Sequence, residues 1–471
     1  MTNGDPSASS AGLAVEARTI DFIPLSERYG SARRLFTIWF SANMTVLGVG
    51  VGTLGVAAGL SFWSAVIAIA AGNAIGTVFM AAHSAQGPQL GIPQMIQSRA
   101  QFGVRGAGFP LIAVVITYLL YCAANAVLIR SPIQALIPIS DIGAVILFAM
   151  ATLVVAYAGY ELIHRLGAVL TVVSTALFLA AAVLLLGQHG MPLRAHTPAA
   201  GAPPADTWHA GLMMMTQAAA WALSYGPYVA DYSRYLPPDV PPAKTFWYTA
   251  SSCWLSSTII MALGAYIALV LPQHADSPGI AVAEAFARGR TLIELLIIVG
   301  VVQGNVMNLY SAYMSTVTIV SGVRGMPTVG RRQKLIVMAT LIFIATAIAA
   351  IARQNFNAYF GDMLSVMIYM LIPWSAINLV DYYFVRKGRY NIADMYRVDG
   401  QYGAFRWRTI AIYLFGILIQ LPFMSLSFYN GPVEKWLGSD FAWLPGLIVP
   451  AALYALVEKK AVHVCNFAES S

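Results

Sequence analysis

Twelve long apolar runs, joined by short connections, account for most of the chain. They cover residues 35–58, 62–84, 107–129, 142–158, 166–187, 210–233, 246–271, 291–320, 333–352, 358–382, 408–428 and 441–458. Most approach the roughly 20 residues that a helix needs to cross about 30 Å of hydrocarbon. Only 10% of the residues are charged, whereas a soluble domain would have about 25%. We therefore predict an all-α polytopic membrane protein.

The basic residues predict how these spans are oriented. With the N-terminus inside, 21 of the 27 Lys and Arg fall on the inner side, and the outer six are Arg130, Arg194, Arg288, Arg290, Arg353 and Lys435. Cytoplasmic connections of membrane proteins carry this excess. The dispersed charges form no patch for nucleic acid. We expect a multi-pass protein of the plasma (inner) membrane, with cytoplasmic tails at 1–33, which is flexible, and 459–471.

Two spans are interrupted at membrane depth. The first reads "FSANMTVLGVGVGTLG", where glycines weaken the helix at Gly48, Gly50, Gly52 and Gly55. The sixth reads "WALSYGPYVADYSRYLPP" from residue 221, with Gly226 and Pro227 in its middle. Proline removes a backbone donor and glycine loosens the turn, so the freed backbone groups can face a solute. A packing kink is the simpler alternative for either break alone.

The two breaks open two blocks of five spans, at 34–187 and 210–383. Because five is odd, the second block is inverted relative to the first. Paired broken helices in inverted halves indicate a transporter whose binding site lies at the membrane midplane. The Pro- and Ala-rich segment 188–209 is expected to be an outer linker between the repeats, and 384–458 to hold two additional helices.

The connection at 85–106, "AQGPQLGIPQMIQSRAQFGVRG", is too polar to span the membrane. Pro93 can start a short amphipathic helix that turns Met95, Ile96 and Phe102 toward the membrane or the protein. A solvated loop is the alternative. At the end of span six, Asp231 and Arg234 can form an ion pair at i and i+3, with a structural role or, alternatively, a role in a gate.

Motifs for other functions are absent or misleading. Residues 50–55 match GxGxxG, but no preceding strand is expected and there is no acid between Glu27 and Asp141, so we exclude a dinucleotide site. Gly72 and Gly76 fit the small-xxx-small pattern of helix packing. No catalytic motif is found, and the three cysteines suggest neither a disulfide framework nor a metal site. We expect no enzyme and no cofactor.

Polar side chains inside four spans outline a cavity, because such groups are costly in a membrane and often functional. They are Ser41, Asn43 and Thr45 in span one; Tyr118, Tyr121, Cys122 and Asn125 in span three; Gln217, Trp221, Ser224 and Tyr225 in span six; and Asn305, Asn308, Ser311 and Ser315 in span eight. Individually they can be interhelical hydrogen-bond partners. Together they suit a neutral, flat solute, since aromatic faces stack a ring and amides pair with its edge.

Two strings carry a resemblance to a known family. "HSAQGPQLGIPQMIQSRAQFG", residues 83–103, and "ADYSRYLP", residues 230–237, resemble the purine-cytosine permease branch of the nucleobase:cation symporter-1 family. The similarity extends from about Arg33 to span twelve. It implies a leucine-transporter-like core of two inverted five-helix repeats with two added helices, and cation-coupled uptake of a nucleobase or related heterocycle.

The resemblance also implies roles for particular residues. Tyr121 and Asn125 correspond to the aromatic and amide of helix 3, where the family often has Trp instead of Tyr. Trp221, beside the break from Ser224 to Gly226, corresponds to the second aromatic, and Asn308 to the amide of helix 8. With Asn43 and Asn305 from the polar spans, these residues form the expected substrate site.

The coupling ion is a proton or sodium. For sodium, the unwound backbone from Asn43 to Leu47 would supply ligands together with Asn308 and Ser311. Relatives that use sodium have a second hydroxyl where this chain has Ala312. Protons need a titratable group, for which the distant candidates are Glu294, Asp362 and the Asp231 pair.

The predicted function is import of a neutral nucleobase, cytosine or a purine, across the lipid bilayer by cation symport. A hydantoin, allantoin or vitamin-like heterocycle is the alternative cargo. A membrane solute sensor or enzyme is the alternative class, and would require an output domain or a catalytic constellation, neither of which is visible.

Overall fold

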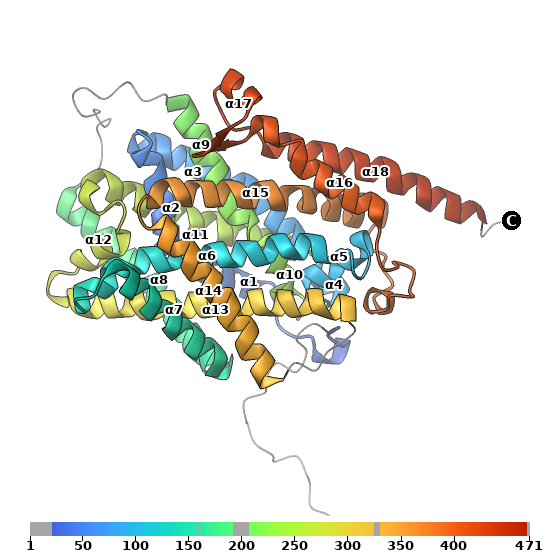
Figure 1. The fold of residues 1–471 in the computed structure, drawn as a ribbon, viewed down its shortest axis with the longest axis horizontal. Helices are drawn as coiled ribbons and strands as arrows, with labels where there is room; N and C mark the ends of the chain where they lie inside the picture. Colours follow the sequence, from blue (N-terminus) through green and yellow to red (C-terminus); the bar gives the residue numbers. More distant parts are fainter. Residues whose placement is uncertain (1–20, 159, 192–206, 325–329, 469–471) are drawn as a thin grey trace, which may run out of the picture.

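The computed structural model describes residues 21–158, 160–191, 207–324 and 330–468, almost all of them helical (Figure 1). The first half contains α1 (Arg33–Ala42), α2 (Val46–Ala57), α3 (Phe62–Ser84), α4 (Gly87–Leu90), α5 (Gln94–Phe102), α6 (Gly108–Leu136), α7 (Asp141–Ala158) and α8 (Tyr160–His189). The second half contains α9 (Thr207–Leu223), α10 (Gly226–Ser233), α11 (Pro242–Val270), α12 (Pro278–Glu284), α13 (Arg290–Arg324), α14 (Arg331–Ala352), α15 (Phe356–Val380), α16 (Trp407–Leu418), α17 (Pro432–Leu437) and α18 (Trp443–Ala468).

Shorter elements complete the chain. A π-helical turn, η4 (Asp381–Val385), continues α15. The strands β1 (Ser425–Leu426) and β2 (Tyr429–Asn430) form an antiparallel hairpin with Ser425 opposite Asn430. The single turns are η1 (Leu25–Glu27), η2 (Pro272–His274), η3 (Ala287–Gly289), η5 (Ala393–Tyr396) and η6 (Leu421–Phe423).

By length and apolarity, seven helices among the described residues can cross a membrane, or eight if the bent pair α1 and α2 is one span. Three shorter apolar helices, Asp141–Tyr157, Trp407–Phe423 and Trp443–Glu458, lie below this length. The sequence expectation of a polytopic helical protein is confirmed. The count of twelve spans stays a prediction.

Both expected breaks are present, but the first lies earlier than predicted. Span one is interrupted at residues 43–45, where α2 begins with the Thr45 hydroxyl accepting a 3.2 Å hydrogen bond from Gly48 N, and the two halves bend by 64°. The prediction that the glycines open this helix is wrong. Gly48 to Gly55 lie inside α2 and allow close packing, since a Cβ on Gly52 would lie 1.8 Å from the Met261 carbonyl oxygen of α11.

The sixth span breaks at Ser224 and Tyr225, between α9 and α10. Pro227 lies in the first turn of α10, a position where proline costs no hydrogen bond. The expected packing role of Gly72 and Gly76 is confirmed. A Cβ on either glycine would lie 2.1 or 2.2 Å from a carbonyl oxygen of α9, so α3 and α9 are in close backbone contact.

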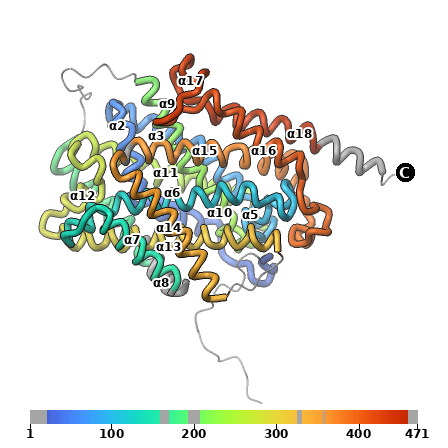
Figure 2. The backbone as a smooth tube through the Cα atoms, in the orientation of Figure 1, coloured from blue at the N-terminus to red at the C-terminus, as the bar shows by residue number. Residues whose placement is uncertain are grey.

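The spans pack in two groups. In one, α3 packs along α9 and α11, and α11 also packs along α1 and α2. In the other, α6 packs along α13 and α14, and α7 packs on α13 and α14. α15 contacts both groups through α9 and α6. Figure 2 shows α16 and α18 along one edge of the molecule, outside these helices.

The connection at 85–106 forms the predicted short helix α5, which begins immediately after Pro93. It is buried on every side, so its polar residues Gln94, Gln97 and Gln101 are as enclosed as its apolar ones. Ile96 and Ala100 join a small second core with Tyr382 and Met395. The helix is therefore part of the protein interior.

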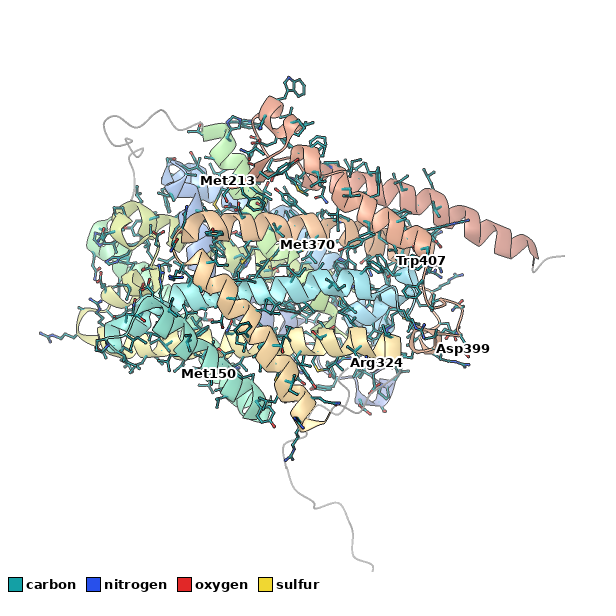
Figure 3. The ribbon with its side chains drawn as sticks, in the orientation of Figure 1. Met150, Met213, Arg324, Met370, Asp399 and Trp407 are labelled. Carbon is teal, nitrogen blue, oxygen red and sulfur yellow. The ribbon has the colours of Figure 1, made fainter. Side chains whose placement is uncertain are left out.

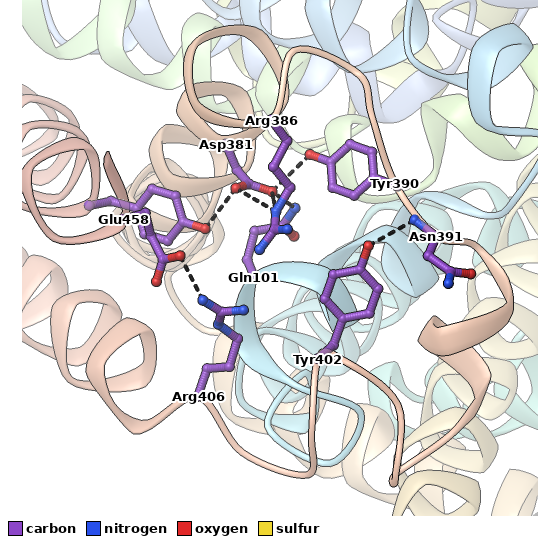
Figure 4. Close-up of polar contacts among 9 residues, drawn as sticks. Gln101, Asp381, Arg386, Tyr390, Asn391, Tyr402, Arg406 and Glu458 are labelled. Carbon is purple, nitrogen blue, oxygen red and sulfur yellow. Dashed lines mark hydrogen bonds and ion pairs between the residues drawn. The ribbon is translucent and has the colours of Figure 1, made fainter. Parts of the chain in front are cut away.

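A buried carboxylate holds α15, α5 and α18 together (Figure 4). Asp381, with 0% exposure, accepts hydrogen bonds from Gln101 (2.7 Å), Tyr390 (2.8 Å) and Tyr454 (2.8 Å). Arg386 pairs with the same carboxylate at 3.1 Å. Such a charge is stable in the interior only with this many partners.

The expected flexible tail at 1–33 is described from Asp21 onward. There the Ile23 N–H donates to the Gly91 carbonyl (2.9 Å), and Arg28 donates to the carbonyls of Ile23 (3.0 Å) and Pro88 (2.7 Å). Residues 21–28 are thereby held against α4. Residues 1–20 and most of the expected outer linker lie outside the described residues.

Candidate functional site

The two broken spans meet through one hydrogen bond between side chains. The indole Nε1 of Trp221 on α9 donates to Oδ1 of Asn43 at the first break, at 2.8 Å. The same oxygen accepts from the Ser257 hydroxyl at 2.9 Å, and the Asn43 amide nitrogen donates to the Trp39 carbonyl and the Ser256 hydroxyl. In this state, every hydrogen-bonding position of the Asn43 amide is used. Asn43 therefore orients the Trp221 indole.

Tyr121 on α6 lies beside Trp221. The two rings are perpendicular, with centroids 5.8 Å apart, and the Tyr121 hydroxyl shares a 2.5 Å hydrogen bond with the Ser224 hydroxyl at the second break. Ser224 also donates to the Trp221 carbonyl. Asn43, Tyr121, Trp221 and Ser224 thus form one connected set across both breaks and helix α6. None of them is more than 6% exposed, so the site is closed in this structure.

A second polar pair lies one helical turn along α6. Asn125 donates to the Asn305 side-chain oxygen on α13 at 3.4 Å, and Asn305 donates to the Thr152 hydroxyl on α7 at 3.2 Å. This chain of amides runs across the second group of helices. It places an amide next to the aromatic set, because Tyr121 and Asn125 occupy the same face of α6.

Four further predicted residues, Leu47, Gly226, Asn308 and Ser311, make no side-chain hydrogen bond to this set within the described part of the chain. Asn308 is half-buried, and its amide makes no hydrogen bond to any described residue. Ser311 lies within hydrogen-bonding reach of the Tyr118 hydroxyl. Leu47 is in the first turns of α2, so the predicted unwound backbone ends at residue 45 and Leu47 is helical. Gly226 faces His83 and Trp374.

Two aromatic residues around the site, Trp39 and Tyr228, were not selected from the sequence. Trp39 packs against Tyr225 (5.5 Å between centroids) and Tyr228 (6.2 Å), and Tyr225 contacts Trp221 (5.9 Å). The signal for Tyr228 was the second tyrosine of "SYGPY". Trp39 carried none, because a tryptophan in an apolar span is equally typical of simple packing.

His83 was missed as well. It lies in the last turn of α3, is fully buried, and stacks on Trp374 of α15 with centroids 4.7 Å apart and an interplanar angle of 16°. Its ring nitrogens contact the Ser375 hydroxyl (2.8 Å) and the Gln94 amide (3.2 Å). The available signal was its place as the first residue of the string 83–103.

A cavity of about 640 Å³ lies at the other end of the molecule. It is lined by α2, α9, α15 and the segment that holds the hairpin and α17, and its lining includes Gln217, which is one turn before Trp221. Ser427 of the hairpin donates to Asp362 at the start of α15 (2.8 Å from its N–H). Tyr369 donates to Asp440, and burial raises the pKa of the Asp440 carboxyl. Met213, labelled in Figure 3, lies on the α9 side of this cavity.

Comparison with known proteins gives three consistent results. The profile of the family described as permease for cytosine/purines, uracil, thiamine, allantoin matches residues 22–444. YxlA of Bacillus subtilis (strain 168), provisionally named a purine-cytosine permease, is 40% identical over 455 residues, covering 95% of this chain and 96% of YxlA. The inward-facing structure of Mhp1 superposes with a TM-score of 0.73, at 17% identity and over 94% of both chains.

A second structure of Mhp1 gives a TM-score of 0.70, again at 17% identity and over 94% of both chains. Its description names a nucleobase-cation-symport-1 family transporter in a closed conformation with bromovinylhydantoin bound. The fold and these matches define the class: the chain is a membrane transporter with the leucine-transporter-like fold, and not an enzyme. It belongs to the family of permeases for cytosine/purines, uracil, thiamine and allantoin. The resemblance drawn from residues 83–103 and 230–237 is confirmed.

Proposed function

We propose that the chain imports a neutral nucleobase, cytosine or a purine, by cation symport with alternating access. The observation that carries this proposal is the set of aromatic, amide and hydroxyl side chains that joins the two broken spans to α6. Each member, Asn43, Tyr121, Trp221 and Ser224, is uncharged. A charged solute would need a buried counter-charge there, whereas a neutral one does not.

The chemistry of the set suits a planar heterocycle. The indole of Trp221 offers a large face for stacking. Asn125 and Asn308 each offer a donor and an acceptor, which match the alternating donors and acceptors at a nucleobase edge. The half-buried amide of Asn308 has no hydrogen-bond partner among the described residues. Because polar groups inside membrane spans are costly and often functional, this amide is a suitable partner for the substrate.

The packing of the helices supports alternating access between two inverted repeats, 34–187 and 210–383. A two-fold relation between the repeats would exchange the contact of α3 with α9 for that of α11 with α1, and the contact of α7 with α13 for that of α14 with α6. All four contacts are present. The two groups of helices then move relative to each other around the site.

The cavity beside Gln217 supports a route to the site from one side. It reaches α9 one helical turn before Trp221, so a solute in it needs only a small movement of α9 or α15 to reach the indole. We place this cavity on the outer face, with both termini in the cytoplasm and the protein in the plasma (inner) membrane.

The test is transport by the purified full chain in proteoliposomes. Exchange of labelled cytosine, adenine, hypoxanthine, uracil, allantoin, thiamine and a benzylhydantoin is measured, with Asn125→Ala as the site variant and Thr340→Ala, exposed on α14, as its control. We expect cytosine or a purine to be exchanged best. Preference for allantoin, thiamine or the hydantoin would overturn the cargo, and exchange of none would overturn the function.

A further inference from the structure

The buried imidazole of His83 lies in a polar layer directly below the second break. This layer is built from the inner end of α3, from α5 and from α15, and His83 itself has 0% exposure. One ring face lies against the Trp374 indole, Nε2 is 2.8 Å from the Ser375 hydroxyl, and Nδ1 is 3.2 Å from the Gln94 amide nitrogen. Position and tautomer of the ring are therefore both set by its neighbours.

The contacts of His83 fit a neutral imidazole, and they can also accommodate the protonated ring. An amide nitrogen only donates, so Nδ1 of His83 accepts from Gln94 and the ring proton lies on Nε2, from which it is donated to Ser375. The Gln94 side-chain oxygen is buried and makes no hydrogen bond with any described residue. Rotation of this amide by half a turn would bring that oxygen to a protonated Nδ1. Gln94 can thus pair with either protonation state of His83.

His83 is also in contact with α10, the second half of span six. A Cβ on Gly226, the first residue of α10, would lie 3.4 Å from Cδ2 of His83 and 3.5 Å from the Trp374 ring. Further along α10, the Asp231 carboxylate accepts a 2.8 Å hydrogen bond from the backbone N–H of Gln94. The imidazole therefore contacts α10 at its start directly and at Asp231 through Gln94.

The elements around His83 bring few charges to it. From α5 it meets Gln94, with Gln97 next to it, and from α15 Trp374, Ser375 and Asn378, all of them uncharged.

Charges on the other neighbouring helices are few. α10 contributes Asp231, while Lys244 of α11 is exposed and His209 of α9 lies at the outer cavity. Asp381 lies beyond Asn378 and is paired with Arg386. Asp231 is the acid that is joined to the surroundings of His83, through the backbone N–H of Gln94.

We propose that His83 binds the coupling proton, taking it up at Nδ1 to form an imidazolium and releasing it when α10 moves. This inference rests on the proposed symport and names its ion. We expect inward opening to move α10 away from α3 and α5, which separates Asp231 from Gln94, draws the Gln94 side chain away from Nδ1 and gives the proton a path through water. The proton then leaves to the cytoplasm, and the ring returns to its neutral form.

The predicted sodium ligands support the same assignment. Leu47 is helical, and Ser311 is within reach of the Tyr118 hydroxyl. Sodium needs several oxygen ligands in one place, whereas a proton needs a single basic atom.

The experiment uses the full chain in proteoliposomes loaded without substrate. An inward proton gradient is imposed with and without sodium, and substrate accumulation and substrate-dependent proton flux are recorded for wild type, His83→Gln and the control His189→Gln, exposed at the end of α8. We expect wild type and H189Q to accumulate substrate with the proton gradient alone. H83Q should lose accumulation and proton flux yet retain exchange of labelled for unlabelled substrate.

Two substitutions at Gln94 test the assignment independently of H83Q folding. Gln94→Glu places a carboxylate beside Nδ1, which should raise the midpoint of the pH dependence of exchange by about one unit. Gln94→Met removes the acceptor and should lower it. A purely structural role for His83 would move neither midpoint.

Proton-driven accumulation by H83Q, unchanged midpoints in both Gln94 variants, or accumulation by wild type that follows only a sodium gradient would each overturn the proton assignment while leaving transport intact. Absence of exchange for every solute of the panel would instead overturn the proposed function itself.

Discussion

Trp221 and Asn43 are 178 residues apart in the sequence and are joined by a 2.8 Å hydrogen bond from the indole Nε1 to the amide oxygen. The bond connects the two helix breaks. Asn43 lies at the end of α1, in the break of span one, and Trp221 lies in the last turn of α9, just before the break of span six. Asn43 is also bonded to Ser256 and Ser257 of α11. Asn43 therefore links the Trp221 indole of α9 to the serines of α11.

Trp221→Phe should separate the orienting role of the indole N–H from stacking. Phenylalanine keeps an aromatic face but leaves the Asn43 oxygen with Ser257 alone. A lost hydrogen bond of this kind is worth about 1 kcal/mol, so the KM for uptake should rise about fivefold. The control is Trp247→Phe, at a tryptophan that is 67% exposed on α11. Equal KM values for the two variants would show that the bond has no part in binding.

Asn125→Ala and Asn308→Ala should weaken substrate binding directly. An unmatched hydrogen-bonding group on the bound heterocycle costs about 1 to 3 kcal/mol, hence roughly ten- to a hundredfold in affinity. Binding is measured by competition against labelled substrate in membranes with matched expression. If these two variants and Trp221→Ala all transported normally, the substrate site would lie elsewhere.

Asp381→Ala should destabilise the protein more than the removal of a single one of the groups that contact Asp381. It leaves Arg386, Gln101 and two tyrosine hydroxyls without their acceptor, and removing one partner of a buried ion pair costs about 3 to 5 kcal/mol. Tyr454→Phe removes one hydrogen bond and should cost about 1 kcal/mol. The unfolding temperatures of the two variants in detergent measure this order of stability.

The control for this series is Arg397→Ala. The Arg397–Asp399 pair is exposed, with 64% and 75% of its side chains accessible, so its loss should have almost no effect. A transition temperature for D381A equal to that of R397A would mean that the Asp381 network does not stabilise the fold.

Gly52→Ala should disrupt the contact between α2 and α11. The new methyl group would meet the Met261 carbonyl oxygen at 1.8 Å, so the two helices would have to separate. Gly211→Ala on α9 is the matched control, because nothing lies within 4 Å of its new methyl group and alanine favours a helix by about 1 kcal/mol. We expect the yield of folded protein, measured by size-exclusion chromatography, to fall for G52A and not for G211A. Equal yields would contradict the packing.

Cysteine labelling tests the orientation. Trp436 of α17 is 82% exposed near the start of α15, and Asp399 lies near its other end, at the right of Figure 3. In a Cys465→Ser background, since Cys122 and Cys253 are buried, W436C should react from outside and D399C from inside. Labelling of both from one side would exclude the proposed topology.

The sequence predicted some local elements and misplaced others for identifiable reasons. Pro93 located the start of α5, because proline is compatible with only a few positions near a helix end. The glycines of span one suggested an opened helix between Gly48 and Gly55. In the structure the same glycines serve close packing against α11, because an absent Cβ both loosens a helix and lets another backbone approach.

The amino-acid sequence alone was enough to predict the membrane class and the interruptions in spans one and six, and it suggested the residue types of the candidate site. These follow from run length, hydropathy and composition, which are properties of a single helix in a lipid environment. The contacts between side chains became known from the folded structure: Asn43 accepts from Trp221, Asn125 pairs with Asn305, and His83 lies between Gln94 and Trp374. Such pairings depend on how helices distant in the sequence pack, and helix periodicity fixes the face that a residue occupies but not the helix that covers it.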